Sequence, residues 1–175
     1  MLIVFAGRPG TGKTTLSRQV AKHLRAALLR IDAIETAIVR SGVAAAPVGP
    51  VGYVVAHEIA AACLAVGTPV VVDAVNPVPE ARQAWPQLAK SAGVSLQVVE
   101  VCVADEAEHR RRIEQRQADL RGQVVPTWEQ VPAQEYESWD ENRDGRRIVV
   151  DAASPTALEE VLSSLGLEQA HTESR

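Results

Sequence analysis

The sequence predicts an α/β fold in which one parallel sheet carries helices on both faces. Five short apolar runs alternate with longer segments that have a helical pattern. Most of the runs are rich in Val, Ile or Leu and lack polar alternation, as expected for strands buried on both faces of a parallel sheet. Regular alternation of such strands with helices is typical of α/β domains. The predicted strands cover residues 2–6, 27–31, 70–73, 96–103 and 147–151.

The segments between these strands predict the helices. Turns that contain glycine, at 66–69 and 92–94, end two of the helices, and Pro155 after Ser154 is typical of a helix start. The predicted helices cover residues 13–25, 32–41, 51–66, 79–92, 105–118, 127–138 and 154–165.

Size and charge limit the class of protein. The chain has 175 residues, and we expect a single domain over 1–168 and a frayed tail at 169–175. The formal net charge of −4 is unfavourable for binding a long nucleic acid. There is no basic leader, and no stretch approaches the roughly 18 apolar residues of a membrane span. Cys63 and Cys102 have apolar neighbours and are interpreted as small buried hydrophobes. We expect a cytoplasmic protein without a membrane partner.

The strongest motif is "GRPGTGKT" at 7–14, which matches G-x-x-x-x-G-K-[ST] between a predicted strand and a predicted helix. Its glycines let backbone N–H groups surround a phosphate chain at a helix N-terminus. Lys13 is expected to reach the β- and γ-phosphates, and the Thr14 hydroxyl to join a Mg²⁺ shell. The motif predicts binding of ATP or GTP with Mg²⁺ through Gly7, Arg8, Pro9, Gly10, Thr11, Gly12, Lys13, Thr14 and Thr15.

An arginine-rich segment follows the fourth predicted strand. Arg112 and Arg116 are four residues apart and share a helix face. Such arginines suit a lid, at about 105–127, that neutralises charge on a transferring phosphoryl group. The alternative is a solvated helix in which arginines pair with Glu106, Glu108 and Glu114.

The chain resembles the small P-loop kinases and phosphotransferases, a group that includes gluconate kinase, adenylyl-sulfate kinase, chloramphenicol phosphotransferase and zeta-toxin kinases. The resemblance is carried by the motif at 7–14, Asp32 after the second strand, and the arginine-rich segment. It implies a P-loop NTPase fold with a five-stranded parallel sheet in the order 2-3-1-4-5 and a mobile lid. It also implies ATP, Mg²⁺ and a hydroxyl acceptor, and the absence of an N-K-x-D motif disfavours a GTPase.

Two aspartates end predicted strands, at the sheet edge where ligands collect in this kind of fold. By resemblance, Asp32 matches the carboxylate that accepts the acceptor's proton; alternatively it is only a helix N-cap. Asp73 has the form of a Walker-B aspartate that holds Mg²⁺ through water. Alternatively Asp73 binds substrate with Asn76 as its partner, or both residues only stabilise the turn before Pro77.

The acceptor site is expected beside these carboxylates. Arg30, two residues before Asp32, either faces the substrate or pairs with a neighbouring acid. By resemblance, residues 40–59 shape the acceptor pocket, in which Tyr53 and His57 would line a moderately apolar cavity. His57 is alternatively a helix histidine without a catalytic part. An aromatic group after the lid is interpreted as an anchor for a helix: Trp128, Tyr136 and Trp139.

The sequence therefore predicts an ATP- and Mg²⁺-dependent phosphotransferase acting on a small-molecule hydroxyl of a sugar, nucleoside or antibiotic. Lys13, Asp32, Arg112 and Arg116 are the expected catalytic residues. Two alternatives stay open: a zeta-toxin-like or polynucleotide-end kinase, and a nucleotide-controlled binding module that hydrolyses ATP slowly.

Overall fold

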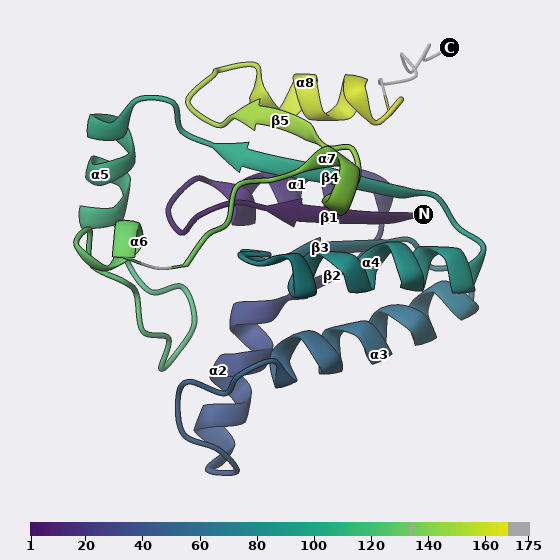
Figure 1. Ribbon diagram of the computed structural model, residues 1–175, viewed down its shortest axis with the longest axis horizontal. Helices are drawn as coiled ribbons and strands as arrows, with labels where there is room; N and C mark the ends of the chain where they lie inside the picture. Colours follow the sequence, from purple (N-terminus) through teal and green to yellow (C-terminus); the bar gives the residue numbers. More distant parts are fainter. Residues whose placement is uncertain (134, 168–175) are drawn as a thin grey trace, which may run out of the picture.

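The computed structural model describes residues 1–133 and 135–167, so the predicted tail at 169–175 lies outside the described residues. Strands and helices alternate along most of the chain (Figure 1). The strands are β1 (Leu2–Ala6), β2 (Ala27–Arg30), β3 (Val70–Asp73), β4 (Leu96–Cys102) and β5 (Ile148–Asp151). The helices are α1 (Lys13–Leu24), α2 (Ile31–Ser41), α3 (Val51–Ala65), α4 (Pro79–Ala92), α5 (Glu106–Glu114), α6 (Gln130–Ala133), α7 (Glu141–Asp144) and α8 (Ala157–Ser164).

All five strands form one parallel sheet in the order β2-β3-β1-β4-β5, which confirms the predicted order. The central strand β1 pairs with β3 on one side and β4 on the other. The β1 and β3 strands are completely buried, which explains their continuous apolar runs.

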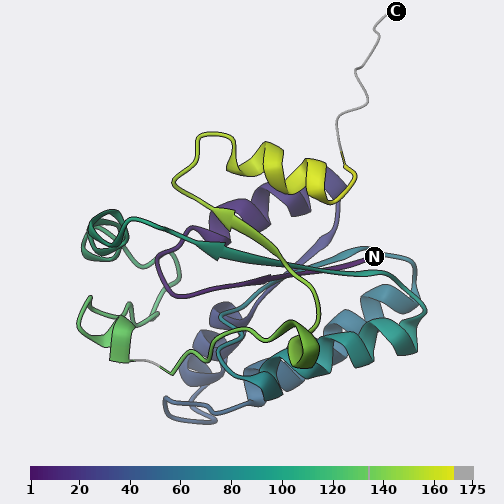
Figure 2. The same ribbon diagram turned by 45° about the horizontal axis from the view of Figure 1, so that its top comes forward.

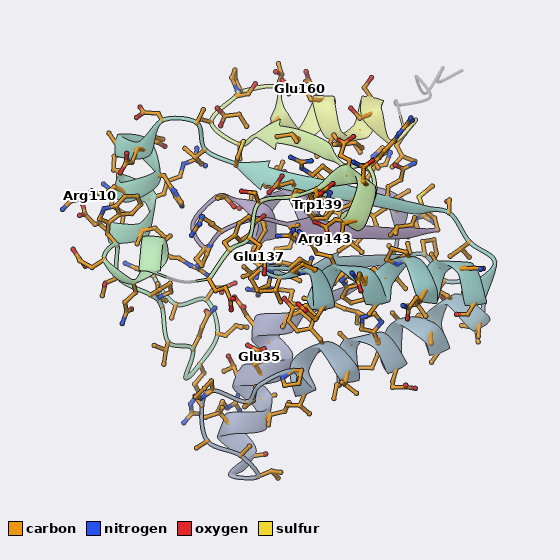
Figure 3. All side chains as sticks on the ribbon, in the orientation of Figure 1. Glu35, Arg110, Glu137, Trp139, Arg143 and Glu160 are labelled. Atoms are coloured by element: carbon orange, nitrogen blue, oxygen red, sulfur yellow. The ribbon has the colours of Figure 1, made fainter. Side chains whose placement is uncertain are left out.

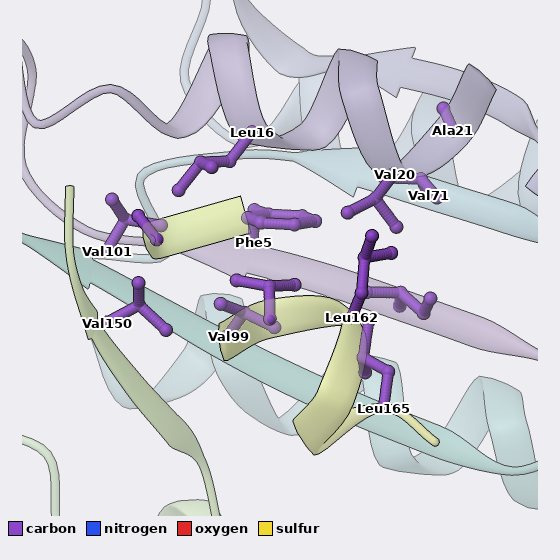
Figure 4. Close-up of a cluster of buried hydrophobic side chains, with 13 residues drawn as sticks. Phe5, Leu16, Val20, Ala21, Val71, Val99, Val101, Val150, Leu162 and Leu165 are labelled. Carbon is purple, nitrogen blue, oxygen red and sulfur yellow. The ribbon is translucent and has the colours of Figure 1, made fainter. Parts of the chain in front are cut away.

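Side chains of the central strands alternate between two cores because successive residues of a strand point to opposite faces. Ile3 and Phe5 pack with α1 and α8 on one face, whereas Leu2 and Val4 pack with α2, α3 and α4 on the other. Figure 4 shows the first core, in which Phe5 lies among Leu16, Val20 and Leu162. Figure 2 shows one layer of helices on each face of the sheet.

Two helix predictions are wrong in extent. The helix predicted at 105–118 ends at Glu114, and within 127–138 only Gln130–Ala133 is helical among the described residues. Tertiary hydrogen bonds hold the later part of that segment extended: the N–H of Glu137 donates to the carbonyl of Pro77, and the guanidinium of Arg82 donates to the carbonyl of Glu137. The short helix α7 lies between this segment and β5, outside the predicted helices.

The carboxyl ends of the strands form one edge of the sheet. The loop after β1, the start of α2 and the segment from α5 to α6 all lie on this side (Figures 1 and 2). Both cysteines are free but only half-buried, less buried than expected. Within residues 1–133 and 135–167, no helix has the length and apolar character needed to cross a bilayer.

Candidate active site

The loop between β1 and α1 has the backbone that the glycine motif predicts. Gly7 and Gly12 have φ angles of 130° and 98°, in a region that side chains with a Cβ rarely adopt. A Cβ at Gly7 would also collide with the carbonyl oxygen of Val101 on β4. Within the described chain, α1 has neither a side-chain cap nor an acidic residue in its first turn. Its first N–H groups therefore offer an anion site at the helix start.

Lys13 is the first residue of α1, and its side chain reaches back to the loop. Its side chain is buried, and its Nζ donates a 2.8 Å hydrogen bond to the carbonyl of Arg8. Burial lowers the pKa of Lys13, and the negative charges of Asp73 and Asp32 act in the opposite direction. The ammonium group is thus held beside the loop. A phosphate chain bound there would replace the Arg8 carbonyl as its hydrogen-bond partner.

A cavity of about 740 Å³ opens beside the loop, a volume in the range of ligand sites. It brings together residues from the loop, both strand-end aspartates and the arginine-rich segment. The predicted site residues that line it are Pro9, Gly10, Gly12, Lys13, Thr14, Thr15, Asp32, Asp73, Arg112 and Arg116. Other predicted site residues are not part of this wall as described: Gly7, Arg8, Thr11, Arg30, Tyr53, His57 and Asn76.

Thr14 and Asp73 meet on the cavity wall. The Oγ1 of Thr14 donates a 2.7 Å hydrogen bond to Oδ2 of Asp73, and the Nε of Arg30 lies 3.3 Å from the same oxygen. Hydroxyl and carboxylate oxygens are the ligand type that Mg²⁺ prefers. This donor pair beside the phosphate loop therefore fits the expected Mg²⁺ site.

Arg30 pairs with neighbouring acids, one of its two predicted alternatives. Besides Asp73, it contacts Asp119 through Nη1 at 2.9 Å and Nη2 at 3.2 Å. Arg18 on α1 donates to the same carboxylate of Asp119. These hydrogen bonds, that from Arg30 first, lower the pKa of Asp119 to about 2. The loop after α5 is thereby tied to β2 and α1.

Asp32 is not the N-cap of α2, because Arg30 occupies that position and Asp32 lies in the first turn. Its Oδ2 accepts a 3.2 Å hydrogen bond from Nε2 of Gln123 and lies 3.8 Å from Nη2 of Arg116. The side chain of Asp32 is 44% exposed, whereas that of Asp73 is 7% exposed. Both aspartates line the cavity, and Asp32 is the more accessible of the two.

The two candidate lid arginines have different surroundings. Arg116 lies near Asp32, but Arg112 donates to Glu108 at 2.8 Å and to the carbonyl of Ala152, after β5, at 3.0 Å. Glu108 also binds Arg111, and these arginines lower the pKa of Glu108 to about 2. The alternative of ion pairs along a solvated helix thus holds for Arg111 and for one of the two contacts of Arg112.

Asn76 is buried, and its side chain makes hydrogen bonds in the interior. Its amide donates to the carbonyl of Phe5 at 3.2 Å and accepts from Nε1 of Trp85 at 2.9 Å. Its backbone N–H donates to the hydroxyl of Tyr53. His57 stacks on Trp85 with ring centroids 3.8 Å apart, and burial lowers its pKa. Together these side chains brace the end of β3 against α3 and α4.

Arg8 is also directed away from the cavity wall. Its Nη1 donates to the carbonyl of Val131, and its guanidinium lies 4.9 Å from the ring centroid of Tyr136. His109 similarly contacts the carbonyl of Pro9 at 2.8 Å and packs edge-on against Trp128. These contacts attach the segment from α5 to Tyr136 to the outer side of the phosphate loop. This agrees with the prediction that the aromatic group acts as an anchor.

Sequence reasoning missed six polar residues of the described cavity wall: Arg18, Glu35, Thr36, Gln117, Asp119 and Gln123. Glu35 could have been found, because it lies three residues after Asp32 and so shares its helix face. Asp119 and Gln123 belong to an irregular loop whose position follows no periodic pattern.

Residues 2–136 match the family model described as "AAA domain". The chain belongs to this family. Together with the sheet order, the membership confirms the resemblance to small P-loop kinases. No curated protein matches the chain.

Solved structures share the fold of this AAA domain at low sequence identity. A sugar kinase from a Janibacter species has a TM-score of 0.70 at 18% identity, covering 95% of each chain. A gluconokinase from Sinorhizobium meliloti has a TM-score of 0.62 at 22% identity, covering 94% of this chain and 90% of that one. Chaetomium thermophilum Kti12, solved with ADP-AlF3, has a TM-score of 0.67 at 21% identity, covering 95% of this chain and 97% of that one.

Proposed function

We propose that the protein is a cytoplasmic, ATP- and Mg²⁺-dependent phosphotransferase that acts on a hydroxyl group of a small molecule. One observation carries the proposal: the phosphate loop with Lys13, the Thr14–Asp73 pair and the exposed carboxylate of Asp32 all face one cavity. A module that only binds a nucleotide does not require an accessible carboxylate opposite the phosphate loop. Solved relatives described as a sugar kinase and a gluconokinase support sugars as the first acceptors to test.

In the proposed reaction, Asp32 accepts the proton of the acceptor hydroxyl. The acceptor oxygen forms a bond to the γ-phosphorus, and the bond from that phosphorus to the bridging oxygen of ADP breaks. Lys13 and Arg116 neutralise charge on the phosphoryl oxygens. Mg²⁺, held by Thr14 and Asp73, would supply further charge neutralisation at the phosphates. Asp73 is a poorer base candidate, because Thr14 and Arg30 already occupy its Oδ2.

The test is ADP release from ATP in the presence of Mg²⁺ and a library of sugars, nucleosides and hydroxylated antibiotics. We expect at least one acceptor to raise ADP release well above the rate without acceptor, and Lys13→Ala to abolish the increase. A 5′-hydroxyl oligonucleotide in the same assay tests the polynucleotide-end alternative. Nucleotide binding without stimulation by any compound would contradict the proposal and favour a nucleotide-controlled module.

A further inference from the structure

The cavity continues beyond the phosphate loop into a part formed by α2, the loop 42–50 and the segment 117–126. One side of this part is polar, with Asp32, Glu35 and Thr36 on α2. Apolar side chains line the same part of the cavity, together with polar groups of the segment 117–126. The apolar ones are Val39 on α2, Pro47 and Val48 of the loop 42–50, and Val124 and Pro126. A molecule that fits this mixed lining has a partly apolar framework that carries polar groups.

The described cavity wall has four cations, of which Arg116 lies 3.8 Å from Asp32. They come from α1 and from the arginine-rich segment: Lys13, Arg18, Arg112 and Arg116. Neither α2 nor the loop 42–50 contributes a cation to the described wall. Once phosphate groups occupy Lys13 and Arg116, the acceptor side retains two carboxylates, Asp32 and Glu35. That side is therefore unfavourable for an anionic group.

Glu35 is placed for a direct contact with the acceptor. It lies one helical turn after Asp32, so the two carboxylates share a face of α2. Among the described residues, no hydrogen bond or ion pair occupies the Glu35 carboxylate. Burial, reinforced by the charge of Asp32, raises the pKa of Glu35 to about 7. A bound donor group would satisfy this carboxyl group.

Gly52 in α3 fixes the position of Glu35 (Figure 3 marks Glu35 on α2, near the start of α3). A Cβ at Gly52 would lie 2.6 Å from Cγ and 3.0 Å from Oε1 of Glu35. Glycine within a helix costs about 1 kcal/mol relative to alanine. Its presence here allows the close approach of Glu35, whose side chain is packed against α3 at the cavity wall.

We propose that Glu35 determines acceptor specificity by binding a hydroxyl or ammonium group next to the hydroxyl that Asp32 activates. The acceptor is then a vicinal diol or amino alcohol on a partly apolar framework, and carboxylated or phosphorylated analogues are rejected. This inference rests on the proposed phosphotransferase function. It assigns Glu35 to binding and leaves proton transfer to Asp32.

The experiment uses matched acceptors that differ only in the group beside the reacting hydroxyl. One set shares a benzylic hydroxyl and carries a hydroxyl, an amine or a carboxylate on the next carbon: 1-phenyl-1,2-ethanediol, 2-amino-1-phenylethanol and mandelate. Another carries the same three groups on a common 1,2-ethanediol unit: glycerol, 3-amino-1,2-propanediol and glycerate. The readout is the ratio of kcat/KM for the amino or diol member to that for the carboxylate member, extended to matched analogues of any acceptor found in the library. A partial loss of folded enzyme cancels in this ratio. We expect a wild-type ratio of at least about 10, and a drop of about tenfold or more in Glu35→Gln.

Glu58→Gln is the matched control, because Glu58 is exposed on α3 outside the cavity wall, and its ratio should equal that of the wild type. Preference of the wild type for carboxylate members, or an unchanged ratio in Glu35→Gln, would overturn the inference and leave the phosphotransferase function standing. Absence of transfer to every compound would overturn both.

Discussion

Arg30, at the end of β2, donates two hydrogen bonds to the carboxylate of Asp119, which follows it by 89 residues. The same guanidinium contacts Asp73, whose oxygen also accepts from Thr14. One arginine therefore connects the loop after α5 with the expected Mg²⁺ site. Any movement of this loop as a lid has to break the contact between Arg30 and Asp119.

The first prediction concerns this contact. Asp119→Asn removes the charge that Arg30 and Arg18 bind, so the loop 115–127 should detach more often. We expect amide hydrogen exchange in 115–127 to accelerate by about tenfold, with exchange in β1 unchanged.

Glu114→Gln serves as the control for the Asp119 variant. It removes an exposed carboxylate that pairs with Arg110 on α5, and such pairs contribute little. Equal exchange rates in Asp119→Asn and wild type would show that Arg30 does not hold the loop.

The second prediction separates binding from chemistry at Asp32. Asp32→Asn keeps the shape and the hydrogen bond from Gln123 but removes the proton acceptor. We expect phosphotransfer to fall by about 100-fold or more, with the Kd for ATP within about threefold of wild type. Calorimetry and acceptor-dependent ADP release measure the two quantities. Normal transfer by Asp32→Asn would show that another residue is the general base, with Asp73 as the next candidate.

The third prediction concerns the pH dependence of stability through Glu35. Its pKa is raised to about 7, by burial first and by the charge of Asp32 second. The contribution of Glu35 to stability is full below its ordinary pKa near 4.5 and is lost as the pH rises through 7.

Glu35→Gln removes the stability loss that the ionisation of Glu35 causes. Between about pH 5 and pH 8, the free energy of unfolding of the wild type should fall by about 1–2 kcal/mol more than that of the variant, because the group is only half-buried. Urea titrations at both pH values measure the difference. Glu58→Gln should follow the wild type, and parallel curves for Glu35→Gln and wild type would refute the raised pKa.

The fourth prediction tests the supporting position of Asn76. Asn76→Ala leaves the indole N–H of Trp85 and the carbonyl of Phe5 without a partner, and Asn76 also has a positive φ of 50° that alanine rarely adopts. We expect a loss of about 2–3 kcal/mol in the free energy of unfolding. The KM for the acceptor should stay within about twofold in the folded fraction, since Asn76 is buried and is not part of the described cavity wall.

Asn142→Ala is the comparison for Asn76, because its side chain is exposed on α7 and should change stability by less than about 0.5 kcal/mol. A stable Asn76→Ala protein with a strongly raised KM for the acceptor would indicate that Asn76 binds the substrate.

The sequence by itself determined the phosphate loop and the sheet. Both depend on local patterns: the glycines from Gly7 to Gly12 set the loop within a few residues, and unbroken apolar runs mark strands buried on both faces. Asp32 and Asp73 could be placed at one edge because parallel strands end on the same side. The predicted helix at 127–138 was wrong because hydrogen bonds to Pro77 and Arg82, distant in sequence, outweigh a local helical pattern.

Only the tertiary structure decided which charges meet. Arg30 binds Asp119 because the loop after α5 returns to β2, and no periodic pattern encodes where such a loop lies. Glu35 faces the cavity because Gly52 of the next helix leaves room for it. Asn76 is withdrawn into the interior by Trp85. These relationships depend on how separate elements pack against one another. The contacts contribute to the free energy of folding only when those elements are brought together.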